Sequence, residues 1–181
     1  SFKGARNLSN AGLPCIGIPG TIDNDIASTE YTIGFDTAVN TVVESVDRLR
    51  DTSQSHERCS VVEVMGRRAG HIAIYAGISC GAIATLIPER PHDLDRDVVS
   101  RMRATLKTGK HHFIVIVAEG VGNTQEICNY IQEKTGIETR LTVLGHVQRG
   151  GTPTAKERVH ASVMGVRAVE LLEQGKGNRV V

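Results

Sequence analysis

The 181-residue sequence predicts an α/β fold in which helices cover open parallel sheets. Strand-like and helix-like segments alternate along the whole chain. The strand-like segments are continuous apolar runs rather than alternations of apolar and polar residues, which is the pattern of parallel strands buried on both faces. Hydrophobic residues make up 40% of the chain, enough for a protein of this length to bury a sizeable core.

The first part of the chain supplies a helix end, a strand and a long helix. Residues 1–14 are expected to form the end of a helix and a turn before the first strand. Residues 15–18 are a short apolar run closed by Pro-Gly, which is typical of a buried strand. Valines at helical spacing predict a helix over 35–50, with Asp36 available as its cap. The polar residues 51–57 are expected to form a loop.

The middle of the chain repeats this alternation. Residues 59–65 are rich in valine and predict a second strand. A helix of small residues is expected over 69–79, because Gly81 interrupts the pattern after it. Residues 84–87 predict a third, short strand, which Pro88 stops.

The last part supplies two more strands and three helices. An apolar stripe predicts a helix through 98–106, and a glycine ends it. The β-branched run 112–118 predicts the fourth strand. A helix over 125–134, a fifth strand over 141–144 and a long helix over 154–173 complete the expected elements.

Composition and charge argue against several classes of function. The net charge is +1 with no long basic block, which argues against a nucleic-acid partner. No apolar run approaches the roughly 20 residues of a membrane span. The four cysteines lie far apart and form no CxxC pair, which fits reduced thiols better than disulfides or a zinc site. We therefore expect a cytoplasmic protein without nucleic-acid or membrane partners.

The segment Pro19–Asp25 follows the first predicted strand and carries two aspartates, a threonine and a glycine. Ligands of open α/β sheets bind beyond the carboxyl ends of the strands. Acid groups there can accept a proton, bind a metal through water, or cap the next helix. The alternative is an Asx turn with solvated aspartates. The segment alone favours neither interpretation.

Polar or glycine-rich groups follow four of the five predicted strands, so they should meet at one edge of the sheet. They are Thr21, Asp23, Asp25, Met65, Gly66, Arg67, Glu119, His146 and Arg149. Each alone has an ordinary explanation, such as a solvated charge or a loop histidine. Together they predict an anionic ligand with hydroxyl groups, held by arginines and a histidine and acted on by a carboxylate.

This set of side chains fits phosphoryl transfer to an alcohol. An aspartate can accept the hydroxyl proton as the oxygen attacks a γ-phosphoryl group. The planar guanidinium of arginine matches phosphate oxygens, and Arg67 is the candidate to balance the charge that develops. The segment His146–Gly151 combines a donor, a cation and two glycines, whose bare amides could approach a second, non-reacting phosphate.

Four segments carry a resemblance to a known family. Pro19–Asp25, Glu63–Arg67, Ala118–Gly120 and Leu144–Gly151 resemble, in order and spacing, the active-site segments of bacterial 6-phosphofructokinases. The resemblance implies the Rossmann-like phosphofructokinase fold. It also implies phosphorylation of the 1-hydroxyl of fructose 6-phosphate, the committing step of glycolysis, with ATP as co-substrate and Mg²⁺ as cofactor. The product would be fructose 1,6-bisphosphate.

The resemblance also implies residue roles. Asp23 would be the catalytic base with Thr21 beside it, and Arg67 would stabilise the transferred phosphoryl group. Asp25 would lie near the magnesium, with no metal ligand directly within this chain. The other implied sugar-phosphate contacts are Ile22, Arg58, Met65, Gly66, Glu119, Arg140, His146, Val147, Gln148 and Arg149.

Two of these contacts have more specific implied roles. Arg140 would grip the 6-phosphate together with His146 and Arg149. Arg58 resembles the arginine that reaches into the sugar site of a neighbouring subunit, which implies a homotetramer with shared sites.

The family's glycine-rich nucleotide loops and its magnesium-binding GGDGS segment lie upstream of anything in this chain, which also does not begin with Met. The resemblance therefore implies the C-terminal portion of a longer enzyme. Residues 1–34 would end the ATP-binding domain and carry the catalytic loop, 35–147 would form the fructose-6-phosphate-binding domain, and 148–181 would return to the ATP-binding domain. We expect the isolated chain to have little or no kinase activity.

Gly20 bears on the phosphoryl donor. Pyrophosphate-dependent relatives usually carry a lysine there, so glycine favours ATP. Two alternatives remain: a pyrophosphate-dependent enzyme of the same fold, and a non-catalytic sugar-phosphate-binding regulatory module. The presence of Asp23 disfavours the module, because such chains usually lose the base.

Three residues resemble part of the family's effector site, which binds ADP or phosphoenolpyruvate between subunits: Arg50, Gly81 and Lys110. Ile83 stands where a glutamate would be expected, and Thr108 where a lysine would. Loss of that carboxylate should remove a contact with magnesium-ADP. The alternative is that Arg50 and Lys110 are plain surface charges.

Overall fold

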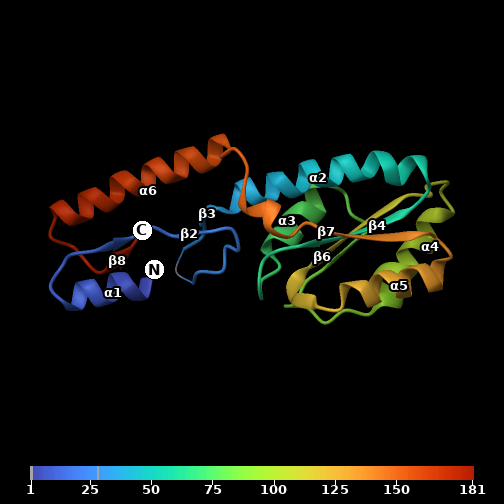
Figure 1. Ribbon diagram of the computed structural model, residues 1–181, viewed down its shortest axis with the longest axis horizontal. Helices are drawn as coiled ribbons and strands as arrows, with labels where there is room; N and C mark the ends of the chain where they lie inside the picture. Colours follow the sequence, from blue (N-terminus) through green and yellow to red (C-terminus); the bar gives the residue numbers. More distant parts are fainter. Residues whose placement is uncertain (1, 28) are drawn as a thin grey trace. The chain divides into compact units, whose positions relative to one another are not determined.

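A computed structural model describes residues 2–27 and 29–181 (Figure 1). The chain divides into two compact units. Unit 1 combines the residues up to Thr37 with Thr152–Val181, and unit 2 comprises Ala38–Gly151. The three domain roles expected from the sequence, with boundaries at 34/35 and 147/148, remain a prediction.

Unit 2 is built on a four-stranded sheet. Its strands are β4 (Cys59–Val64), β5 (Ala84–Leu86), β6 (Phe113–Ala118) and β7 (Thr139–Val143). The strand order is β5-β6-β4-β7, and every pairing is parallel. The carboxyl ends of the strands therefore meet at one edge of the sheet, called the carboxyl edge below, and their amino ends meet at the opposite edge.

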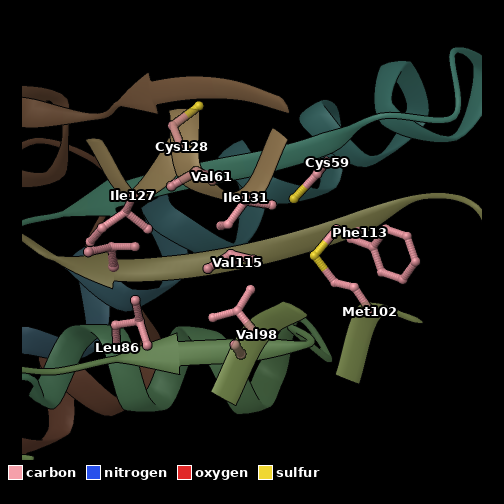
Figure 2. Close-up of a cluster of buried hydrophobic side chains, with 12 residues drawn as sticks. Cys59, Val61, Leu86, Val98, Met102, Phe113, Val115, Ile127, Cys128 and Ile131 are labelled. Atoms are coloured by element: carbon pink, nitrogen blue, oxygen red, sulfur yellow. The ribbon is translucent and has the colours of Figure 1, made fainter. Parts of the chain in front are cut away.

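One face of this sheet packs on the π-helical turn Asp95–Val99, on α4 (Ser100–Leu106) and on α5 (Thr124–Thr135) (Figure 2). The helical elements of unit 2 are most of α2 (Phe35–Ser55), α3 (His71–Ser79), a π-helical turn (Asp95–Val99), α4 (Ser100–Leu106) and α5 (Thr124–Thr135). Val61 and Val115 of the sheet lie in one buried cluster with Met102 and Ile131. The buried strands explain the continuous apolar runs in the sequence.

Helix α2 is longer than the expected 35–50, because it continues to Ser55 through residues expected to form a loop. Ser53 is 1% exposed, and its hydroxyl lies 2.6 Å from that of Ser60 on β4. Ser53 also donates to the Leu49 carbonyl at 2.8 Å. The last turns of α2 thus contact the sheet through the Ser53–Ser60 pair. A search for apolar residues at helical spacing cannot detect such a polar contact.

Unit 1 contains two small parallel sheets and two helices, α1 (Phe2–Asn10) and α6 (Ala155–Glu173). Strand β1 (Ile16–Gly17) pairs with β8 (Arg179–Val180), and β2 (Gly20–Thr21) pairs with β3 (Ile33–Gly34). The expectation that the first strand shares one sheet edge with the others was wrong. That run pairs with the end of the chain, and the two-residue strands β2, β3 and β8 are too short to carry a periodic pattern.

None of the helices in the described residues is both long enough and apolar enough to cross a membrane.

Candidate active site

The loop after β2 carries two aspartates, Asp23 and Asp25. The Asp23 backbone N–H donates to Thr21 Oγ1 at 3.2 Å, and Thr32 Oγ1 donates to the Thr21 carbonyl at 2.8 Å. Asp23 is buried with 8% exposure, whereas Asp25 is exposed and Ile22 is partly buried. A loop held by its own hydroxyl and by the neighbouring strand keeps a carboxylate in a fixed place, as a general base requires.

The carboxyl edge of unit 2 brings Gly66, Arg67 and Glu119 together. Glu119 follows β6, and its Oε1 accepts hydrogen bonds from the backbone N–H groups of Gly66 at 3.1 Å and Arg67 at 2.6 Å. Gly66 has a φ of 145° and Arg67 a φ of 56°. Residues other than glycine rarely adopt positive φ, and such strain gathers at functional sites. The carboxylate therefore fixes an unusual turn.

The side chain of Gln148 makes two hydrogen bonds to the backbone, and its expected role as a substrate contact stays a prediction. It is 1% exposed. Its Oε1 accepts from the Met65 N–H at 3.0 Å, and its Nε2 donates to the Gly145 carbonyl at 3.0 Å. Gln148 thus joins the end of β4 to the 3₁₀ turn Gly145–Arg149 that follows β7.

The same turn presents three of the predicted residues to solvent. His146, Val147 and Arg149 are all exposed. Met65, by contrast, is buried with 7% exposure. The turn lies beside the end of β4, because the Leu144 N–H donates to the Glu63 carbonyl at 3.2 Å. The Arg149 cation and the His146 ring, which can donate a hydrogen bond, together suit an anion.

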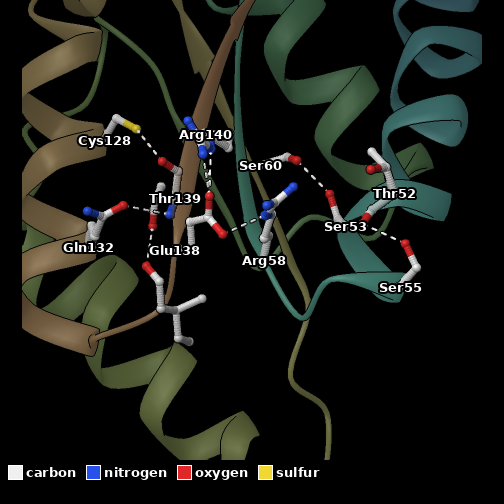
Figure 3. Close-up of polar contacts among 11 residues, drawn as sticks. Thr52, Ser53, Ser55, Arg58, Ser60, Cys128, Gln132, Glu138, Thr139 and Arg140 are labelled. Carbon is white, nitrogen blue, oxygen red and sulfur yellow. Dashed lines mark hydrogen bonds and ion pairs between the residues drawn. The ribbon is translucent and has the colours of Figure 1, made fainter.

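Arg58 and Arg140 lie at the amino ends of their strands, away from the carboxyl edge. Both pair with Glu138, at 2.7 Å from Arg58 Nε and 2.8 Å from Arg140 Nε (Figure 3). These hydrogen bonds, first that from Arg58, hold the pKa of Glu138 below its ordinary value. The structure therefore groups Arg140 with Arg58 rather than with His146 and Arg149 in the same chain.

Two of the predicted effector residues, Arg50 and Lys110, lie near enough to His112 to act on its charge. Arg50 Nη2 donates to the carbonyl of Cys80, which precedes Gly81. Burial lowers the pKa of His112 below its ordinary value, and the positive charges of Lys110 and Arg50 lower it further. Gly81 has a φ of 59°, which suits a chain turning tightly here. The arrangement supports either an anion site or solvated charges.

The lowered pKa of His112 predicts a loss of stability in acid. Below about pH 6.5, His112 binds a proton more readily in the unfolded chain than in the folded one. The free energy of unfolding therefore falls on acidification. The His112→Gln variant lacks this difference. We expect its urea midpoint to fall less than that of the parent chain between about pH 7 and about pH 5.5. Equal falls in both proteins would contradict the assignment.

The described residues contain no group of three or more histidine, cysteine, aspartate or glutamate side chains that could hold a metal ion. Magnesium usually keeps several waters and binds one or two carboxylates together with substrate phosphates. Asp25 offers one exposed carboxylate. That no metal ligand lies directly within this chain stays a prediction, and we assign no step to the ion.

Comparison with known proteins identifies the family. The phosphofructokinase family model matches residues 1–172. The chain belongs to the phosphofructokinase family. The resemblance drawn from the four segments is thus confirmed. The ATP-dependent 6-phosphofructokinase of Bacillus cereus strain B4264 is 56% identical over 181 residues, which is all of this chain and 56% of that protein. The chain therefore spans little more than half the length of this Bacillus relative.

Solved phosphofructokinase structures confirm the predicted α/β fold. Pichia pastoris phosphofructokinase in the T-state is 31% identical with a TM-score of 0.83, over 95% of this chain and 20% of that chain. Pyrophosphate-dependent phosphofructokinase from Nitrosospira multiformis is 24% identical with a TM-score of 0.83, over 97% of this chain and 49% of that chain. The second likeness concerns the fold alone.

Sequence reasoning missed one buried carboxylate, Glu157 of α6, which is 2% exposed. The spacing Thr154-x-x-Glu157 was an available signal, because it matches a helix capping box. It would have predicted the start of α6 but not the contacts that the Glu157 carboxylate makes.

Proposed function

We propose that the full-length protein containing this chain transfers the γ-phosphoryl group of ATP to the 1-hydroxyl of fructose 6-phosphate. The observation that carries the proposal is the grouping of Arg67, Glu119, His146 and Arg149 at the carboxyl edge of unit 2. A relative with 56% identity is named as an ATP-dependent 6-phosphofructokinase, and every one of these residues lies within the matched region.

Each residue has a distinct task in the proposed reaction. Asp23 accepts the proton of the 1-hydroxyl as its oxygen attacks phosphorus, and Thr21 orients Asp23. The guanidinium of Arg67 stabilises charge on the transferred group. At the other end of the sugar, His146 and Arg149 bind the 6-phosphate through charge-assisted hydrogen bonds.

Glu119 has two tasks in this proposal: it holds the backbone turn at Gly66 and Arg67, and it binds the sugar. Its hydrogen bonds to the Gly66 and Arg67 N–H groups both use Oε1, so Oε2 is the oxygen we assign to a sugar hydroxyl. Met65 and Gly66 form the neighbouring wall. One carboxylate thereby fixes the turn that presents Arg67 and also recognises the substrate.

Truncation of Glu119 should weaken sugar binding. Glu119→Ala leaves two backbone N–H groups without their acceptor, at a cost of about 1–3 kcal/mol for each one that water does not reach. We expect KM for fructose 6-phosphate to rise roughly tenfold or more in steady-state assays of the full-length protein. Glu119→Gln keeps one acceptor oxygen and should lose less. Equal KM values for the alanine variant and the parent would contradict the role.

Gly20 supports ATP as the donor. A side chain at position 20 would meet no atom within 4 Å of its Cβ among the described residues. Steric packing therefore does not require glycine there. Its small size instead leaves room for the inner phosphates of ATP. The pyrophosphate-dependent alternative shares this fold, and the non-catalytic module would keep sugar binding alone.

One experiment separates these three functions. The full-length protein is assayed with fructose 6-phosphate and either MgATP or magnesium pyrophosphate, and sugar binding is measured by calorimetry. We expect turnover with ATP and little with pyrophosphate. Faster turnover with pyrophosphate would favour the alternative enzyme. Saturable sugar binding without transfer from either donor would favour the regulatory module.

We further propose a homotetramer in the cytoplasm. Arg58 and Arg140 stand together at the amino ends of β4 and β7, where they would serve the sugar site of a neighbouring subunit. The four cysteines are unpaired in the described structure, which suits a reducing compartment. Arg50, Gly81 and Lys110 remain candidates for an effector site.

A further inference from the structure

Glu157 is a buried carboxylate at the start of α6 to which no role has yet been given. Its Oε1 accepts hydrogen bonds from the Tyr31 hydroxyl at 2.7 Å and the Asp36 N–H at 2.9 Å. Its Oε2 accepts one from the Gly34 N–H at 2.8 Å. With 2% exposure, this charge depends on these donors, because a buried carboxylate without partners is costly.

The contacts of Glu157 differ from those that its local sequence predicts. In a capping box, the glutamate would bond back to the N–H of Thr154. Only half of the box forms: Thr154 Oγ1 accepts the Glu157 N–H at 3.2 Å. The carboxylate instead accepts hydrogen bonds from the Asp36 and Thr37 N–H groups in the first turn of α2, and Thr154 Oγ1 donates to Asp36 Oδ2 at 2.6 Å. The N-termini of α2 and α6 thus cap each other within unit 1.

Tyr31 is held firmly as a donor to Glu157. Its ring stacks on His160 with centroids 4.2 Å apart, and Lys156 Nζ lies 5.0 Å from the ring centroid. Burial, followed by the hydrogen bond to Glu157, raises the pKa of Tyr31 well above its ordinary value. The hydroxyl therefore keeps its proton and continues to donate through neutral pH.

One hydrogen bond of Glu157 ends on β3, the strand that pairs with β2 directly before the Asp23 loop. Gly34 stands opposite Thr21 in the β2–β3 ladder. Thr32 of the same segment donates to the Thr21 carbonyl, and Thr21 Oγ1 accepts the Asp23 N–H. A continuous set of short contacts therefore runs from Glu157 through β3 and Thr21 to Asp23.

We infer that Glu157 is a positioning residue for Asp23: its carboxylate fixes β3 and the start of α2, and through them the loop that presents the base. This inference rests on the proposed function. Its physical basis is that catalysis is far more sensitive than folding to small displacements of a reacting group. Residues at the carboxyl edge of unit 2 do not depend on Glu157 for any contact described above, so sugar binding should be spared.

The test compares Glu157→Gln with the parent in the full-length protein. Glutamine has only one acceptor oxygen. Its NH₂ group would face a donor that now bonds to the second carboxylate oxygen. We expect kcat to fall roughly 10- to 100-fold while KM for fructose 6-phosphate stays within about twofold. Glu157→Asp keeps the charge and both oxygens and should restore most of kcat. Glu170→Gln on the same helix removes an exposed partner of Arg167 and should change neither constant.

Amide hydrogen exchange supplies a readout that needs no catalysis. In Glu157→Gln, residues 20–24 should exchange faster, while β6 of unit 2 should be unchanged. The inference is overturned if exchange in 20–24 is unchanged, or if it rises equally in β6. It is also overturned if the loss of activity merely follows the fraction of unfolded protein. A parent enzyme that transfers no phosphoryl group would overturn the proposed function instead, and the exchange result would still decide whether Glu157 holds the loop.

Discussion

Replacing Asp23 by serine in the full-length protein should lower kcat roughly 10²- to 10⁴-fold, the usual contribution of a general base. Serine keeps a small polar side chain that can lie beside Thr21, but it cannot accept the proton of the sugar hydroxyl at neutral pH. The Asp23 backbone bond to Thr21 Oγ1 does not involve the carboxylate, so the loop should keep its path. The measurement is steady-state kinetics together with direct titration of fructose 6-phosphate.

The second measurement on Asp23→Ser is the dissociation constant of fructose 6-phosphate, which distinguishes a catalytic base from a binding residue. It should change little, because Glu119, His146 and Arg149, to which sugar and 6-phosphate binding are assigned above, lie on unit 2. Asp51→Ser, which removes an exposed carboxylate of α2, is the matched control and should leave kcat unchanged. Weaker sugar binding with parental turnover would make Asp23 a binding residue rather than the base.

Replacing Gly66 by alanine should have the largest effect on the carboxyl edge of unit 2. A Cβ at Gly66 would lie 2.3 Å from the Ala69 carbonyl oxygen, and the φ of 145° is one that L side chains rarely adopt. Strain and overlap together should destabilise the protein by about 2–4 kcal/mol. The Gly66 N–H must also shift from Glu119, so KM for fructose 6-phosphate should rise roughly tenfold or more. Thermal unfolding and steady-state kinetics measure the two effects.

Gly165→Ala is the matched control for this prediction. Gly165 lies inside α6 with ordinary helical geometry, and its Cβ would meet nothing within 4 Å among the described residues. Alanine there should be neutral or stabilising by about 0.5–1 kcal/mol. A Gly66→Ala protein with parental melting temperature and parental KM would show that the turn relaxes freely, against the role given to Glu119.

The sequence predicted those parts of the fold that its apolar runs determine. Strands β4 and β6 are nearly fully buried, so their runs were long and β-branched, and their predicted limits lie within one residue of the observed ones. Strands β2 and β3 contain two residues each and are defined by pairing, which no local pattern encodes. The end of α2 was missed because the Ser53–Ser60 pair, rather than an apolar stripe, packs it.

The sequence predicted those site residues that directly follow a strand of the parallel sheet. Residues after parallel strands share an edge, and Gly66, Arg67 and Glu119 do meet there. The commitment of Gln148 to two backbone groups depends on distances between segments that the sequence does not contain. The pairing of Arg140 with Arg58 through Glu138, near the start of β7, could not be derived from chain order alone, and its role at the 6-phosphate stays a prediction.

The central claim is phosphoryl transfer from ATP to the 1-hydroxyl of fructose 6-phosphate, and identification of the product by ³¹P NMR tests it most directly. The full-length protein is incubated with MgATP and fructose 6-phosphate, and the spectra are followed over time. The proposed function predicts equal rates of appearance of ADP and of a sugar bisphosphate with a new phosphate on carbon 1. ADP released together with inorganic phosphate, or no change in fructose 6-phosphate, would contradict it.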